Sequence, residues 1–285
     1  MKKLLGVLSV LLLITDFTFA GGSGQAVNNQ PAAQDVPKPY TISIGGSTSV
    51  NPLMELLVAE YGKTHSNIKF TISATGSGDG IKGVPAGTCE IGMSSRELTP
   101  AEIGTGIDTL VIAIDGIALI VNNSNLVTGL TQTQIKDIYT GTISRWEQLG
   151  ASANGKSGAI AVVSREPGSG TRTAIEELLK FQDQMVKSAI EFDGTGAIIA
   201  EVSRNADAIG YISLGSMNSS IKAISVDNVA ASTANVINGS YKIARPFILM
   251  TKKGAPVNPE TKAFLDWIMG PDGQKIVKTN WISVK

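Results

Sequence analysis

VVSREPGSGTRTAIEELL, residues 162–179, is the stretch of sequence that decides the fold. A β-branched run leads to Arg165, a turn of glycine and hydroxyl residues follows, and Ile175, Leu178 and Leu179 then repeat at the spacing of one helix face. A strand, a turn and a helix in that order form the unit of an α/β fold. In open α/β sheets, ligands bind at the carboxyl ends of the strands, where this turn lies. The stretch therefore predicts an α/β fold with a binding site in the turn.

The same arrangement recurs three times in the N-terminal half of the chain. Glycine and hydroxyl residues follow predicted strands in the turns Gly45-Gly46-Ser47-Thr48-Ser49, Ala74-Thr75-Gly76-Ser77-Gly78 and Met93-Ser94-Ser95-Arg96. Glycine lets the backbone approach a ligand, a helix N-terminus attracts negative charge, and hydroxyls add neutral donors. Arg165 supplies a planar fork for two oxygens of a tetrahedral ion. One such turn is a common helix cap, but four in one chain favour a shared oxyanion site.

Outward from these turns, short apolar runs alternate with amphipathic stretches, which predicts a mostly parallel sheet. Predicted strands span residues 40–44, 69–73, 110–114, 117–121, 159–163 and 243–251. Helices are predicted around residues 53–61, 135–139, 175–179 and 264–268, and at the capping box that starts at Thr99. Asn51 is predicted to cap the first of these helices, with Pro52 as its first residue.

The N-terminal segment reads as a cleaved secretory signal. Residues 1–20 combine Lys2 and Lys3 with a short apolar run and the small-residue ending Thr18-Phe19-Ala20. No cysteine lies near the expected cleavage point, so we expect release into a periplasm without a lipid anchor. Residues 21–39 are polar and rich in glycine, proline and glutamine, which is typical of a flexible linker.

Composition excludes several classes of function. The chain has 285 residues, 42% of them apolar, and a formal net charge of zero, which lacks the electrostatic footprint of a nucleic-acid-binding protein. Cys89 is the only cysteine, so neither an intramolecular disulfide nor a thiolate metal cluster is expected. Histidine and carboxylate clusters of the kind that hold metals are missing as well. We expect no metal and no cofactor.

Two motifs point toward enzymes. Residues 150–157, GASANGKS, match the phosphate-binding P-loop pattern, but a predicted helix precedes them and a strand follows, the reverse of the required order. The many Gly-Ser pairs suggest a serine hydrolase, yet the one histidine, His65, lies in a polar turn, and no true Gly-x-Ser-x-Gly elbow is present. A lysine-assisted serine enzyme stays open. A non-enzymatic binding protein is the preferred interpretation.

Five blocks of sequence, taken in order, resemble the phosphate-binding component of bacterial phosphate ABC importers, the PstS family. The blocks are ISIGGSTSVNPL at 42–53, SATGSGDGIKGVPAGTCEIGMSSREL at 73–98, LTQTQIKDIYTGTISRWEQLG at 130–150, VVSREPGSGTRTAIEELL at 162–179 and ADAIGYISLGS at 206–216. The resemblance extends from Tyr40 to the C-terminus.

The resemblance implies a two-lobed, class II periplasmic-binding-protein-like α/β fold whose hinge is a pair of crossover strands near Asp115-Gly116 and Arg245-Pro246. Lobe I would combine residues 40–114 with 246–285, and lobe II would span 115–245. Phosphate would be buried between the lobes, and the closed form would be recognised by ABC transporter permease subunits in the inner membrane. We expect a monomer that is not an enzyme.

Carried over by motif, the phosphate ligands come from both lobes. Lobe I would supply Thr48, Ser49, Ser77 and Ser95, and lobe II would supply Arg165, Ser169, Gly170 and Thr171.

One position departs from the family pattern. Many family members have an aspartate where this chain has Ser95, and that aspartate accepts the proton of monohydrogen phosphate and repels sulfate. A serine both donates and accepts, so it does not discriminate by charge. Asp79 and Glu166 are candidates for part of that discriminating role. The alternative is that Asp79 is only a turn residue and that Glu166 only forms an ion pair with Arg165. Sulfate, molybdate and arsenate remain alternative ligands, and a serine-dependent hydrolase or phosphatase remains a less favoured function.

Overall fold

The computed structural model describes residues 38–285. The predicted signal peptide at 1–20, and the predicted linker at 21–39 apart from Lys38 and Pro39, lie outside these residues. Within the described range, every helix is too short or too polar to cross a lipid bilayer.

The group of elements that we call lobe I is built on three parallel strands. They are β1 (Tyr40–Gly46), in the middle, with β2 (Ile68–Ala74) and β3 (Ile91–Ser94) on either side. The intervening helices are α1 (Asn51–Gly62), α2 (Ser77–Ala86) and α3 (Pro100–Ile103), and the C-terminal part of the chain adds α8 (Pro259–Ile268), α9 (Pro271–Asn280) and β12 (Ile282–Ser283). Strand and helix alternate here as the turns predicted.

The second group, lobe II, has its own parallel strands. Strand β6 (Ala161–Arg165) lies between β8 (Ala208–Ser213) and β7 (Ile190–Phe192). The other elements are β5 (Gly129–Leu130), α4 (Gln132–Tyr139), the 3₁₀ helix η1 (Trp146–Ala153), α5 (Gly170–Leu178), α6 (Gly194–Arg204), η2 (Leu214–Ser216), β9 (Ile221–Ala223), β10 (Ser225–Val226) and α7 (Thr233–Ile237). Strands β5 and β10 form a separate parallel pair.

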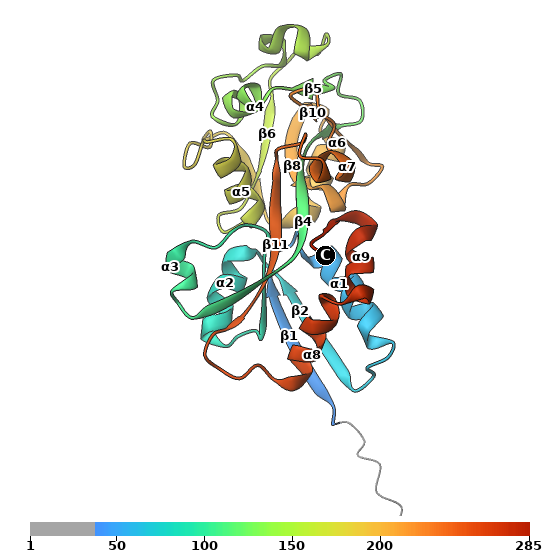
Figure 1. The fold of residues 1–285 in the computed structure, drawn as a ribbon. Coiled ribbons are helices and arrows are strands. Elements are labelled where there is room, and N and C mark those ends of the chain that lie inside the picture. The colour runs from blue at the N-terminus through green and yellow to red at the C-terminus, as the bar shows by residue number, and fades with distance from the viewer. Residues whose placement is uncertain (1–37) are drawn as a thin grey trace, which may run out of the picture. The chain divides into compact units, whose positions relative to one another are not determined.

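Two long antiparallel strands belong to both groups. Strand β4 (Ile107–Asn122) and strand β11 (Ala244–Lys252) pair with each other and join the two sets of parallel strands into one sheet, in the order β2-β1-β3-β11-β4-β8-β6-β7. They run side by side through the middle of the ribbon in Figure 1. Strand β4 carries the chain from lobe I into lobe II and β11 returns it, so they run in opposite directions.

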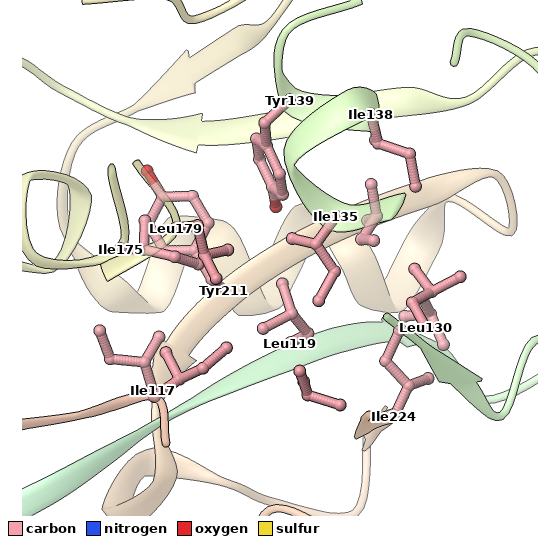
Figure 2. Packing of buried hydrophobic residues seen from close by; sticks show 14 of the residues in the cluster. Ile117, Leu119, Leu130, Ile135, Ile138, Tyr139, Ile175, Leu179, Tyr211 and Ile224 are labelled. Carbon is pink, nitrogen blue, oxygen red and sulfur yellow. The ribbon is translucent and has the colours of Figure 1, made fainter. Parts of the chain in front are cut away.

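Each group encloses a separate hydrophobic core. The main core of lobe I draws on residues between 42 and 113 and between 247 and 281. The main core of lobe II draws on residues 117–243. Figure 2 shows this second core, where side chains of β4, α4, α5 and β8 meet, among them Ile117, Leu119, Ile135, Tyr139, Ile175 and Tyr211. Two cores on either side of one strand pair explain why the fold has two lobes.

Two features of the sheet differ from the sequence prediction. The strands predicted at 110–114 and 117–121 form one continuous strand, β4, which passes through Asp115 and Gly116 without a break. The sheet is also mixed and not mostly parallel, because β4 pairs antiparallel with β11, β8, β9 and β12. Local periodicity predicts a strand but gives no information about the direction of its partner.

A buried ion pair joins the two crossover strands. Asp115 on β4 and Arg245 on β11 are cross-strand partners, exposed to 1% and 4%, and the Arg245 Nη2 donates to Asp115 Oδ2 at 3.2 Å. The hydroxyl of Ser213 donates to Asp115 Oδ1 at 2.8 Å. Burial raises the pKa of Asp115 to about 6 although Arg245 is adjacent, and burial lowers the pKa of Arg245 to about 10. The ionised carboxylate is therefore costly at neutral pH.

The pair predicts a specific pH dependence of stability. The pKa of Asp115 is higher in the folded protein than in the unfolded chain, so its contribution to stability is present below pH 4 and is lost as the pH rises through 6. Between pH 4 and pH 7, the free energy of unfolding of the wild type should fall by about 2 kcal/mol relative to that of Asp115→Asn, which mimics the protonated carboxyl. Urea unfolding of both proteins across this range measures the difference, and parallel pH curves would contradict it.

Candidate functional site

The first turn of the site lies between β1 and α1. Its start requires a glycine, because Gly46 has a φ of 127° and a Cβ there would lie 2.3 Å from the carbonyl oxygen of Met93. Ser47 Oγ accepts hydrogen bonds from the backbone N–H groups of Ser49 and Val50, at 3.2 and 3.3 Å. The turn is therefore held by Ser47.

The prediction that Asn51 caps α1 was wrong. Asn51 is itself the first helical residue, and its side chain donates to Glu55 Oε1 at 2.7 Å. Because Ser47 satisfies the N–H groups before the helix, the hydroxyls of Thr48 and Ser49 remain available for contacts across the lobes.

The second and third turns of lobe I are joined by two serines. Ser77 is the first residue of α2, and Ser95 directly follows β3. The Ser95 N–H donates to Ser77 Oγ at 3.1 Å, and the two hydroxyl oxygens lie 3.3 Å apart. Both residues are almost fully buried, with exposures of 0% and 1%. The two turns thus present one compact pair of hydroxyls.

Lobe II contributes a cation and a helix N-terminus. Arg165 is the last residue of β6, and Ser169 caps α5, accepting from the Arg172 N–H at 3.4 Å. Gly170 and Thr171 are the first two residues of α5. Their N–H groups have no intrahelical acceptor and lie at the positive end of the helix dipole, which is an arrangement that binds anions.

Contacts across the lobes bring these groups together. Ser49 Oγ lies 2.8 Å from Thr171 Oγ1, and Arg165 Nη2 donates to Thr48 Oγ1 at 2.9 Å. A Cβ added to Gly170 would lie 2.2 Å from Ser77 Oγ and 2.8 Å from Ser95 Oγ. The structure therefore places the predicted site residues of lobe I against three of those of lobe II, namely Arg165, Gly170 and Thr171, whereas the Ser169 side chain caps α5.

Thr195 is a member of this cluster that sequence reasoning missed. Its Oγ1 lies 3.3 Å from Thr48 Oγ1 and 3.5 Å from Ser49 Oγ, and Arg165 Nη1 donates to it at 3.4 Å. It is the second residue of α6 and is 7% exposed. The signal was present in Phe192-Asp193-Gly194-Thr195-Gly196, which repeats the arrangement of the other turns. The preceding strand, β7, has just three residues and no apolar run, so the pattern was not recognised.

The charge of Arg165 is balanced by its neighbour. Glu166 accepts from Arg165 Nε and Nη2, both at 2.7 Å, and from the Gly194 N–H at 3.4 Å. The Tyr211 hydroxyl accepts from the backbone N–H of Arg165 at 3.2 Å. Burial raises the pKa of Tyr211 to about 12, so this hydroxyl stays neutral. A neutral ion pair and several helix N-termini thus set the local potential.

The other candidate carboxylate lies elsewhere. Asp79, in the first turn of α2, lines a cavity of about 270 Å³ together with Ser43, Thr71 and Cys89. Among the described residues, its carboxylate makes no hydrogen bond to the hydroxyls of the cluster. Of the two candidate carboxylates, Glu166 is therefore the one that is hydrogen-bonded to a residue of the site, Arg165.

The structure also gives the setting of the two enzyme-like features. The P-loop match at 150–157 falls in η1 and the turn before β6, so no strand leads into it. The ring of His65 stacks on Tyr61 at 3.8 Å, and its Nδ1 lies 2.9 Å from Thr64 Oγ1. His65 therefore makes these contacts with residues at the C-terminal end of α1.

The close contact of Gly170 with Ser77 and Ser95 gives a test of how the two lobes meet. Gly170→Ala should weaken anion binding by about tenfold or more, because a Cβ at residue 170 would lie 2.2 Å from Ser77 Oγ and force the two turns apart. Gly196→Ala is the matched control, since it also lies in the first turn of a helix and its Cβ would meet no atom within 4 Å. Equal anion affinities of the two variants, measured by calorimetry, would contradict the proposed contact.

The protein has two α/β lobes on one pair of crossover strands, and buried hydrogen-bond donors of the two lobes face each other. This is the architecture of a two-lobed solute-binding protein. Comparison with known proteins agrees. A model of the PBP superfamily domain matches residues 23–272. The phosphate-binding protein PstS of Borreliella burgdorferi is 30% identical over 248 residues, covering 83% of this chain and 87% of that protein.

Solved structures give the same result. A provisionally assigned phosphate ABC transporter substrate-binding protein from Clostridium perfringens, with bound phosphate, has a TM-score of 0.82 and 42% identity and covers 86% of this chain and 100% of its own. An ABC-type phosphate transport receptor from Vibrio cholerae has a TM-score of 0.70 and 32% identity, with coverages of 85% and 99%. The chain belongs to the PBP superfamily and, within it, to the PstS family of phosphate-binding proteins.

Proposed function

We propose that this protein captures inorganic phosphate between its two lobes and delivers it to an ABC importer. One observation carries the proposal: buried hydroxyls from both lobes, a buried guanidinium and the N-termini of α2, α5 and α6 converge on one place. A tetrahedral oxyanion offers four acceptor oxygens to such a donor set. The relatives in Clostridium perfringens, Vibrio cholerae and Borreliella burgdorferi are named for phosphate, which supports the choice of anion.

The lobes would divide the chain at the crossover strands. Lobe I would comprise residues 40–114 and 246–285, and lobe II residues 115–245. The separate cores on either side of Asp115 and Arg245 support these boundaries. Bending of β4 and β11 at the buried ion pair would open and close the cleft.

Each site residue would have a defined part in binding. Thr48, Ser49, Ser77 and Ser95 would receive the anion on lobe I, and Arg165, Ser169, Gly170 and Thr171 would cover it on closure, with Thr195 as a further hydroxyl donor. Closure removes water, which strengthens every donor contact. The anion would have to bind the closed form more tightly than the open form, because equal affinity shifts no population.

The cellular setting follows from the sequence. A cleaved signal at residues 1–20 without a nearby cysteine would release the mature protein into the periplasm. There it would act as a monomer, without metal or cofactor, and present its closed form to permease subunits of the inner membrane. It would bind its ligand and leave it chemically unchanged.

Arg165 gives the most direct test of the site. Arg165→Ala should weaken phosphate binding by more than about tenfold, because it removes a charge-assisted fork that is 2% exposed. Arg204→Ala is the control, since Arg204 also lies in lobe II, but its side chain is 70% exposed and paired with Glu201. Calorimetry with phosphate measures both. An unchanged affinity in Arg165→Ala would show that the site has been misplaced, and turnover of a chromogenic phosphate ester would point to an enzyme.

Ser95 gives a test of ligand choice. A carboxylate at this position accepts a proton from monohydrogen phosphate but repels fully ionised sulfate. Ser95→Asp should therefore raise the ratio of phosphate to sulfate affinity by about tenfold relative to Ser95→Asn, which has the same shape without the charge. Asp79→Asn should leave the wild-type ratio unchanged, because its carboxylate lines a different cavity. A change in the ratio across pH in Asp79→Asn would instead make Asp79 a discriminator.

A further inference from the structure

Strand β6 loses one of its two neighbouring strands just before it reaches Arg165. It pairs with β8 at Ala161 and Val162, whereas its pairing with β7 continues to Arg165. The polar groups of successive strand residues point to alternate sides, and the Glu166 N–H donates toward β7, to the carbonyl oxygen of Phe192 at 3.3 Å. The N–H and C=O groups of Arg165 therefore face the side from which β8 has diverged.

Two side chains take the place of the missing strand. The Tyr211 hydroxyl accepts from the Arg165 N–H at 3.2 Å, and Arg172 Nη1 donates to the Arg165 carbonyl oxygen at 2.9 Å. Arg165 is 2% exposed, and a buried backbone group without a partner costs as much free energy as a lost hydrogen bond. Both backbone polar groups of Arg165 are thus satisfied by side chains from other elements.

Tyr211 is a rigid support for this contact. It lies on β8 in the main core of lobe II and is 1% exposed. Its hydroxyl oxygen lies 2.8 Å from Ser164 Oγ. Because burial raises the pKa of Tyr211 to about 12, the hydroxyl keeps its proton and can accept from the Arg165 N–H while it shares a hydrogen bond with Ser164.

Arg172 links Arg165 to the N-terminus of α5. Its Nε donates to Glu176 Oε1 at 2.9 Å, and its Nη1 donates to Glu191 Oε1 at 2.5 Å, so the guanidinium is held from two sides. Its own backbone N–H is the group that the Ser169 side chain caps. Arg172 therefore fixes the position of the Arg165 backbone relative to the first turn of α5, and lobe II presents its anion donors from these two places.

The direction of the Arg165 guanidinium depends on this backbone support. The guanidinium reaches Thr48 at 2.9 Å and Thr195 at 3.4 Å, and the second distance is close to the limit of a hydrogen bond. Glu166 is the next residue in the chain, so its ion pair with Arg165 can move as a unit. Beyond that pair, Glu166 is held by the Gly194 N–H at 3.4 Å. A small shift of the end of β6 would therefore misplace the guanidinium.

We propose that Tyr211 and Arg172 are positioning residues for Arg165, which replace a neighbouring strand and thereby set the affinity of the anion site without touching the anion. The inference rests on the proposed phosphate site and assigns to it two residues that act through Arg165. Support of this kind decides how well a binding group is preorganised.

Tyr211→Phe is the first test, measured by calorimetry of the mature protein with inorganic phosphate. The substitution removes one oxygen atom and should weaken phosphate binding by about fivefold, because the Arg165 N–H loses its acceptor. Tyr241→Phe is the matched control, since Tyr241 is 2% exposed in the same core and its hydroxyl donates to the carbonyl oxygen of Ile117 at 2.8 Å. It should lower the melting temperature to a similar extent but change phosphate affinity by less than about twofold.

A double-mutant cycle with Arg165→Ala separates positioning from a general loss of stability. In the Arg165→Ala background, Tyr211→Phe should change phosphate affinity by less than about twofold, because the group that Tyr211 positions is gone. Arg172→Lys is the second variant, and it keeps a positive charge beside Glu176 and Glu191. It loses the planar fork that also reaches the Arg165 carbonyl oxygen, so it should weaken binding by about threefold when Arg165 is present and not when it is absent.

The outcomes distinguish this inference from the proposed function. If the wild type binds phosphate and Arg165→Ala weakens binding, but Tyr211→Phe and Arg172→Lys do not, the positioning role is wrong and the proposed function stands. Equal losses with and without Arg165 would also overturn the positioning role, because the effect would not pass through Arg165. A wild type that binds no phosphate would overturn the proposed function, and this inference with it.

Discussion

Burial of a single guanidinium constrains the rest of the site. Arg165 is 2% exposed, and a charge removed from water needs a partner and a hydrogen bond for each remaining N–H group. Glu166, the next residue in the chain, supplies the partner from the same lobe. A second N–H of Nη2 reaches Thr48 on lobe I, and one N–H of Nη1 reaches Thr195 on lobe II. One residue thus links the two lobes at the place where the hydroxyls gather.

Electrostatic attraction for an anion is local in this protein, because the chain as a whole has no net charge. Helices α2, α5 and α6 begin at Ser77, Gly170 and Gly194, so their positive ends lie at the cluster. Such dipoles and neutral hydroxyls need no counter-charge when the site is without ligand, unlike a group of lysines. The arrangement favours the small anion that fits it over nucleic acid or an acidic surface.

The sequence was informative where a local pattern decided the structure. Glycine and hydroxyl residues after a strand identified the turns of the site, and the family resemblance implied the individual residues in them. Thr195 was missed because β7 is too short to produce an apolar run. Strand β4 was predicted as two strands because Asp115 interrupts its apolar pattern. Asp115 is tolerated there through Arg245, 130 positions later in the chain, and no local rule contains that partner. The antiparallel pairing of β4 with β11 is equally non-local.

The backbone hydrogen bond from Gly78 N–H to the carbonyl oxygen of Gly168, at 3.0 Å, joins the first turn of α2 to the turn before α5. This latch between the lobes uses backbone atoms alone, and it needs glycine at residue 168, where φ is 90°. Mutation can therefore exchange the serines and threonines around it during evolution without dismantling the latch.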